Sequence, residues 1–164
     1  MRILCCVDGT NIEQVSKAVE TLLCTETRMI GVLYVTDTGP EVQMERHRER
    51  FLRPPHPPLP RREQMRQAEE ASAQEILEEG SRYLGDAELL RRTGRPEREI
   101  VHAAVEWQAD VIVICSRSHQ GGGPLPPGPK SVGHVARFVL DHAPCPVLLI
   151  RPPVSTAGLF PPRL

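Results

Sequence analysis

The stretch from Gly94 to Arg151 limits most strongly what this chain can fold into. It opens with Arg95-Pro96-Glu97-Arg98-Glu99, in which an early proline and acidic residues favour a helix N-terminus. Apolar residues then recur at helical spacing until an unbroken β-branched run, Val111 to Ile114, which predicts a strand buried on both faces. Helix and strand in this order are typical of α/β proteins, in which ligands bind at the carboxyl edge of a parallel sheet.

The pattern continues to the end of this stretch. After Cys115 the chain is polar and glycine-rich, from Ser116 to Gly123. Helical spacing resumes from Val132 to Leu140, and Val147 to Ile150 is an apolar strand. The loop therefore lies at the mouth of the predicted sheet.

The N-terminal half repeats the alternation. Ile3 to Val7 is a short apolar strand, and Asp8-Gly9-Thr10-Asn11 is a turn that can cap the helix after it. One apolar face of that helix is formed by Ile12, Val15, Ala18, Val19 and Leu22. Met29 to Val35 is a second strand, about 61–84 a second helix, and Ala87 to Arg91 a weaker third strand. Five strands alternating with four helices predict one doubly wound α/β domain, a parallel sheet with helices on both faces.

Composition restricts the partners. The 164 residues suit a single domain, and a formal net charge of −1 offers no general attraction for nucleic acid or anionic membrane. No apolar run spans a bilayer and no signal peptide is apparent, so we expect a cytoplasmic protein. The five cysteines lack metal spacing and are interpreted as buried small hydrophobes. Neither His102 nor His142 has a cysteine or acid at ligand spacing, so no metal site is predicted.

Several separated motifs resemble one family. They are the strand and acidic turn from Ile3 to Gly9, then Leu33-Tyr34-Val35, Gly94-Arg95-Pro96 with Ile100-Val101, and Gly133 to Arg151 with Ala143-Pro144-Cys145-Pro146. Over about residues 1–152 the chain resembles the universal stress protein (UspA-type) family. The resemblance implies an adenine nucleotide α-hydrolase-like fold with strand order 3-2-1-4-5. It also implies a homodimer paired through Val147 to Ile150, an apolar strand that would lie at the sheet edge.

In nucleotide-binding members of this family, the fourth strand runs into Gly-x2-Gly-x9-Gly-Ser/Thr, whose backbone N–H groups hold the phosphates. A first-strand acid and a second-strand valine hold ribose and adenine, and Asp8 and Val35 stand at those positions. Aligned from the strand, Cys115 and Ser118 replace the first two glycines. Aligned from the helix, Gly123 and Gly133 fit, but Gln120 replaces a glycine and His134 the hydroxyl residue. Neither register satisfies the motif, and Pro124, Pro126, Pro127 and Pro129 remove N–H donors.

Two functions remain open. The first is an ATP or related adenine nucleotide site, with or without Mg²⁺, in a dimeric stress-response module; the second is a ligand-free dimer that serves as a scaffold for a protein client. The candidate nucleotide-binding residues are Asp8, Gly9, Thr10, Val35, Cys115, Ser116, Ser118, Gly121, Gly123, Gly133, His134 and Val135. No catalytic constellation emerges, so at most a slow ATPase is expected. An adenylate-handling enzyme is disfavoured because Val7-Asp8-Gly9-Thr10-Asn11 lacks clustered serines and glycines.

Further expectations concern a proline-rich stretch, the C-terminal residues and two side chains of the helix that begins near Pro96. The proline-rich stretch 38–60 is predicted to be an insertion, whose role as a lid or a docking arm stays open. Residues 153–164 are predicted to be a flexible tail. His102 is expected near the apolar face of its helix, and Trp107 is expected to be a packing anchor.

Overall fold

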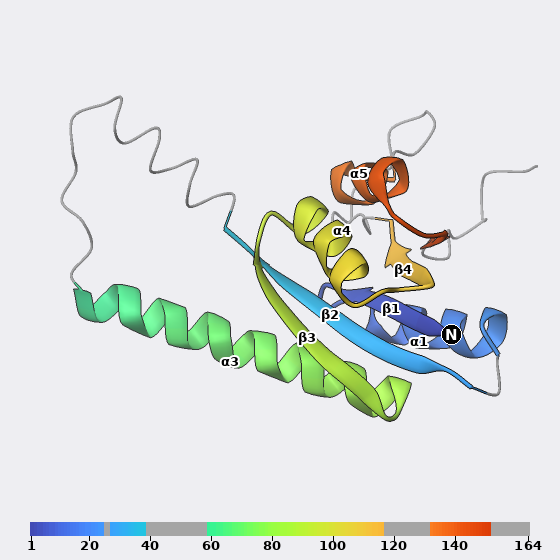
Figure 1. The fold of residues 1–164 in the computed structure, drawn as a ribbon. Coiled ribbons are helices and arrows are strands. Elements are labelled where there is room, and N and C mark those ends of the chain that lie inside the picture. The colour runs from blue at the N-terminus through green and yellow to red at the C-terminus, as the bar shows by residue number, and fades with distance from the viewer. Residues whose placement is uncertain (25–26, 39–58, 117–131, 152–164) are drawn as a thin grey trace, which may run out of the picture.

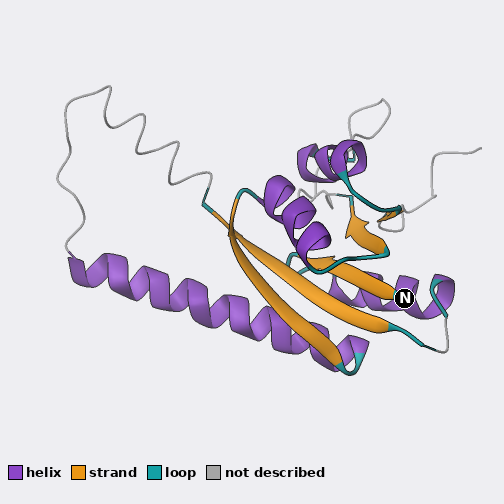
Figure 2. Ribbon diagram, viewed as in Figure 1, coloured by secondary structure: helices purple, strands orange, loops and turns teal. Residues whose placement is uncertain are grey.

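A computed structural model of the chain describes residues 1–24, 27–38, 59–116 and 132–151. The elements in chain order are β1 (Arg2–Val7), α1 (Ile12–Leu22), β2 (Met29–Asp37), α3 (Leu59–Leu84), β3 (Ala87–Gly94), α4 (Pro96–Glu106), β4 (Val111–Cys115), α5 (His134–His142) and β5 (Val147–Ile150). Strands alternate with helices along these ranges, as Figure 2 shows. The predicted α/β class is confirmed.

The five strands form one parallel sheet in the order β3-β2-β1-β4-β5, which is the expected order. The central strand β1 pairs on both sides, so that Ile3 lies opposite Ile30 of β2 and Val111 of β4. From β1 the chain builds the sheet outwards through β2 and β3, and it then returns to add β4 and β5 on the other side (Figure 1). The carboxyl ends of β1 and β4 therefore flank the point where the strand order reverses.

The sheet separates two apolar layers, because successive side chains of a strand point to opposite faces. One layer, under α1 and α3, includes Ile3, Cys5, Val7, Val15, Val19, Val32, Leu77 and Val113. The other, under α4 and α5, includes Leu4, Cys6, Leu33, Ile100, Ala104, Ile112, Ile114 and Val139. Because β1 and β4 contribute to both layers, their near-continuous apolar sequences are explained.

Two strands are longer than predicted. β2 continues past Val35 to Asp37, and β3 continues past Arg91 to Gly94, since the two strands stay paired in register to that point. The end of β3 is polar because β3 is an edge strand with alternately exposed residues. Apolar patterning therefore underestimates its length.

Helix ends also differ from the sequence prediction. α5 begins at His134 rather than Val132, because Gly133 has a φ of 93°, outside the helical range. It extends to His142. α3 begins at Leu59 and so takes in the last two residues of the predicted insertion. The rest of that insertion beyond Thr38, and the predicted tail 153–164, lie outside the described residues.

The cysteine prediction is right for some thiols and wrong for another. Cys5 and Cys6 are buried and Cys115 and Cys145 are half-buried, but Cys24 is exposed because it lies beyond the last turn of α1. All five thiols are free. The expectation for His102 is also wrong, since its side chain is exposed on α4.

Trp107, just after α4, is confirmed as a packing anchor. Its ring packs into the layer under α4 and α5 and lies against Gly31 of β2. The indole Nε1 donates a hydrogen bond to Glu88 Oε2 at 2.8 Å. Within the described ranges, the helices are all too short or too polar to cross a lipid bilayer.

Candidate functional site

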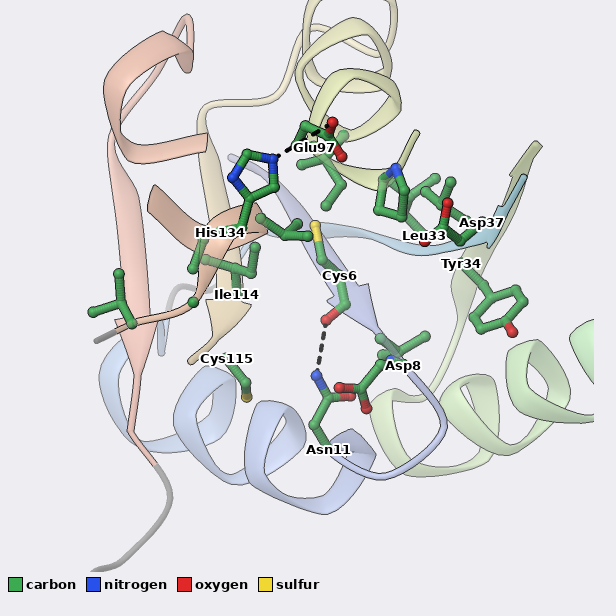
Figure 3. Close-up of a pocket in the computed structure, with 18 residues that line it drawn as sticks. Cys6, Asp8, Asn11, Leu33, Tyr34, Asp37, Glu97, Ile114, Cys115 and His134 are labelled. Carbon is green, nitrogen blue, oxygen red and sulfur yellow. Dashed lines mark hydrogen bonds and ion pairs between the residues drawn. The ribbon is translucent and has the colours of Figure 1, made fainter. Parts of the chain in front are cut away.

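A cavity of about 450 Å³ opens at the carboxyl edge of the sheet. Its walls come from the ends of β1, β2 and β4 and from the first residues of α4 and α5, as Figure 3 shows. Its lining is Cys6, Val7, Asp8, Asn11, Leu33, Tyr34, Val35, Asp37, Pro96, Glu97, Ile100, Ile114, Cys115, Val132, Gly133, His134, Val135 and Ala136. The cavity thus lies at the reversal of strand order, where open α/β sheets bind ligands.

The turn after β1 is held by its own side chains. Asp8 Oδ1 accepts hydrogen bonds from the Thr10 backbone N–H at 2.9 Å and the Thr10 hydroxyl at 2.8 Å. Asn11 Oδ1 accepts from the Asp8 N–H at 3.0 Å, and Asn11 Nδ2 donates to the Cys6 carbonyl at 3.3 Å. The Asp8 carboxylate is therefore fixed in place at the cavity edge while remaining exposed.

This network corrects the capping prediction for the turn. Asn11 occupies the N-cap position of α1 but makes no side-chain hydrogen bond to the helix within the described structure. Its amide is directed back to the end of β1 instead. Asn11, which the sequence suggested as a helix cap, thus stabilises the end of β1 beside the cavity.

An apolar wall also lines the cavity. Leu33 and Val35 of β2 contribute to the layer under α4, which adds Ile100. Asp37, at the end of β2, brings a second carboxylate to the lining. Such a surface suits a flat, largely apolar ring with polar groups at its margin.

The N-termini of α4 and α5 meet at another part of the rim. Pro96 and Glu97 open α4, and Gly133 and His134 open α5. Glu97 Oε1 lies 3.7 Å from His134 Nε2, the dashed contact in Figure 3. Because the first N–H groups of a helix have no partner within it, the start of α5 offers backbone donors to an anion.

The cavity thiols are poor nucleophiles. Burial, reinforced by the negative charge of Asp8, raises the pKa of Cys115 to about 11. Burial also raises the pKa of Cys6 above its usual range, with nearby thiols adding to the effect. At neutral pH both side chains are therefore protonated, and they act as small wall residues.

The structure brings together half of the sequence-predicted site residues. Asp8, Val35, Cys115, Gly133, His134 and Val135 line the cavity. Gly9, Thr10 and Ser116 lie beside it: Thr10 holds Asp8, and Ser116 donates its backbone N–H to the Ile150 carbonyl. Ser118, Gly121 and Gly123 lie outside the described residues.

Sequence reasoning missed three polar residues of the lining, two of them acidic. Asn11, Asp37 and Glu97 line the cavity but were not predicted as site residues. One signal was available for two of them: Asp37 ends a strand and Glu97 starts the helix after the next strand, so a parallel sheet brings both to one edge. Asn11 gave no comparable signal beyond its place in the turn after β1.

The fold and the cavity define an α/β domain with a cavity at the strand reversal. Residues 1–151 match the model of the Universal stress protein family. The chain belongs to this family. A curated relative, the universal stress protein in the QAH/OAS sulfhydrylase 3′ region of Thermus aquaticus, is 41% identical over 66 residues. That match covers 40% of this chain and 43% of the relative, so the aligned part is less than half of either protein.

Solved structures show the same fold. Universal stress protein UspA from Lactobacillus plantarum is 22% identical with a TM-score of 0.61, and the alignment covers 92% of this chain and 97% of that one. A universal stress protein family protein from Arabidopsis thaliana, solved with AMP bound, is 17% identical with a TM-score of 0.59. That alignment covers 96% of this chain and 95% of the plant protein.

Proposed function

We propose that this universal stress protein binds an adenine nucleotide in the cavity at the strand reversal. One observation supports the proposal above all: Asp8, Val35 and Gly133, which come from three separated motifs, line the same cavity. A volume of about 450 Å³ falls in the range typical of small-molecule sites. The AMP bound to the Arabidopsis protein of the same fold supports an adenine nucleotide as the ligand.

Each part of the cavity suits one part of such a ligand. The apolar wall of Leu33, Val35 and Ile100 suits the adenine ring. Asp8 presents a fixed carboxylate that can accept hydrogen bonds from ribose hydroxyls. The start of α5 at His134 supplies N–H donors and a favourable partial charge for phosphate.

Mg²⁺ would accompany the nucleotide rather than occupy a site built by the protein. Asp8, Asp37 and Glu97 line the cavity, but over residues 1–24, 27–38, 59–116 and 132–151 no cluster of acids, histidines or cysteines is arranged to hold a metal ion. The phosphates would therefore contribute most of the ligands to any Mg²⁺ present.

The test is mass spectrometry of ligand released from freshly purified protein, together with calorimetric titration of AMP and ATP. We expect recovered adenine nucleotide and measurable heat. The variant Val35→Phe enlarges a side chain in the proposed adenine wall and should weaken binding at least about tenfold. The added atoms take up space that the adenine ring needs, and the packed site can make room for both only at a cost in strain. The matched control Val105→Phe adds the same volume at an exposed position of α4 and should leave binding unchanged.

The competing function is the ligand-free scaffold. Absence of recovered ligand, with no heat in either titration, would contradict the nucleotide proposal and favour the scaffold. Binding that survives Val35→Phe unchanged would place the nucleotide elsewhere on the protein.

A further inference from the structure

We propose that Glu97 sets the charge selectivity of this cavity: its carboxylate, paired with His134 at the start of α5, weakens binding with each phosphate added to the ligand. The cavity would then favour an adenine nucleoside or nucleoside monophosphate over a triphosphate. This inference rests on the proposed nucleotide binding and makes it more specific.

Glu97 and His134 differ strongly in their exposure to solvent. Glu97 is the second residue of α4, and its side chain is only 12% exposed. His134 is the first residue of α5, and its side chain is 79% exposed. The carboxylate is therefore set into the cavity wall while the imidazole lies at its mouth, and the two are 3.7 Å apart (Figure 3).

A phosphate bound at the start of α5 would lie close to the Glu97 carboxylate. The N–H groups at the start of α5 would draw it towards His134. Glu97 already places a negative charge beside that histidine. A phosphate at this position must therefore approach a carboxylate with little exposure to solvent, where like-charge repulsion is screened less than at the surface.

The start of α4 attracts a phosphate less strongly than the start of α5 does. Pro96, the first residue of α4, has no backbone N–H to donate. The Glu97 carboxylate, on the same first turn, already interacts favourably with the helix dipole. The positive end of α4 is thus offset by a side chain of α4 itself.

The other acidic groups of the lining act in the same direction as Glu97. Asp8 and Asp37 are also acidic, and His134 is the one described lining residue that can carry a positive charge. Asp8 is engaged by Thr10 in the turn after β1, on the opposite side of the close-up in Figure 3 from the Glu97–His134 pair. Glu97 is therefore the acid placed to repel a phosphate at α5.

The experiment measures the affinities of adenosine, AMP and ATP for the full chain by calorimetry, first in EDTA and then in MgCl₂. For Glu97→Gln we expect ATP to bind on the order of tenfold more tightly, AMP about threefold, and adenosine within about twofold of wild type, because the lost repulsion grows with ligand charge. The substitution keeps the size of the side chain, and a melting curve verifies folding.

A matched control lies two residues further along the same helix. Glu99 is also paired with a histidine, His102 at 3.9 Å, but neither residue lines the cavity. Glu99→Gln removes the same charge from α4 and should leave the ratio of ATP to adenosine affinity unchanged. His134→Asn leaves Glu97 without its partner and should weaken AMP and ATP relative to adenosine.

The outcomes separate the two proposals. If adenosine binds but Glu97→Gln leaves the ATP to adenosine ratio as in wild type, the inference about Glu97 is overturned and nucleotide binding stands. If the substitution weakens ATP only in MgCl₂, Glu97 is a metal contact and the inference is also wrong. If no adenine ligand binds wild type or any variant, nucleotide binding itself fails.

Discussion

Gly9, in the turn after β1, lies directly against Ile76 of α3. A Cβ atom built on Gly9 would be 3.0 Å from Ile76 Cδ1. Gly9 also has a φ of 85°, a left-handed conformation that is unfavourable for residues with a Cβ. The turn that carries Asp8 is therefore fixed both by its backbone and by contact with a helix from another part of the chain.

Gly9→Ala should lower the free energy of unfolding by about 1–2 kcal/mol, the usual cost of the left-handed conformation. The contact with Ile76 should add to that cost. Gly85→Ala is the matched control, because Gly85 has a φ of 81° but nothing within 4 Å of its built Cβ. Urea unfolding followed by circular dichroism compares the two variants. Equal losses would show that the turn is not pressed against α3.

Gly31→Ala tests the packing of the tryptophan. A Cβ on Gly31 would be 3.0 Å from the Trp107 ring, which is held by its hydrogen bond to Glu88 and by the Arg2 guanidinium 5.6 Å from the ring centroid. Because the ring cannot easily move, we expect a loss of about 1–3 kcal/mol in the free energy of unfolding. In a Trp107→Leu background the same change should cost clearly less. If Gly31→Ala costs the same free energy of unfolding in both backgrounds, the contact between Gly31 and Trp107 is contradicted.

Sequence patterning predicts the fold well where burial is two-sided. Val111 to Ile114 of β4 is buried over its whole length, so its apolar run identifies both the strand and its central place in the sheet. β3 shows the limit of the method. Its residues from Arg92 to Gly94 are polar on an edge, and pairing with β2 rather than hydrophobicity decides that they are strand.

The candidate site was predictable only in part. Asp8 directly follows β1 and Val35 lies near the end of β2, and the parallel topology brings them together. Glu97 was overlooked because an acid in the first turn of a helix already has an explanation in the helix dipole. The parallel topology brings the start of α4 to the same edge of the sheet, and the packing of α4 beside α5, which no local pattern encodes, then places Glu97 next to His134 in the cavity lining.

Thiol reactivity should differ sharply among the cysteines. Cys24 is exposed, whereas burial and the charge of Asp8 hold the pKa of Cys115 at about 11 and burial raises that of Cys5 to about 12. Iodoacetamide at pH 8 should therefore modify Cys24 first, as peptide mass spectrometry can show. Alkylation of Cys115 should speed up about tenfold per pH unit up to about 11, because the reactive thiolate fraction rises with pH.

Two variants check this prediction. Cys24→Ser should remove the rapid alkylation by iodoacetamide that is expected at pH 8. Asp8→Asn should accelerate alkylation of Cys115 at a given pH, since loss of the nearby negative charge lowers the pKa of that thiol. Fast modification of Cys115 in the folded wild-type protein at pH 8 would contradict its burial.

The edge strand β5 leads to a proposal about assembly. Val147 to Ile150 is apolar and half-buried, and among the described residues β5 is the last strand of the sheet and pairs with β4 alone. An apolar strand with an open edge favours pairing with another strand, and two copies can cover both edges through one two-fold contact. We propose a homodimer through β5, and light scattering at tens of micromolar protein should give twice the mass of the chain.

Lysine substitutions on the two edges of the sheet locate the contact. Leu149→Lys in β5 should shift the protein to monomer, because a charged side chain on an edge strand opposes pairing. Leu89→Lys in β3 places the same charge on the opposite edge, at a residue already 38% exposed, and should leave the dimer intact. A wild-type monomer would refute the proposal, and a dimer lost only with Leu89→Lys would move the interface to β3. Circular dichroism of each variant establishes that the change in mass reflects association and not unfolding.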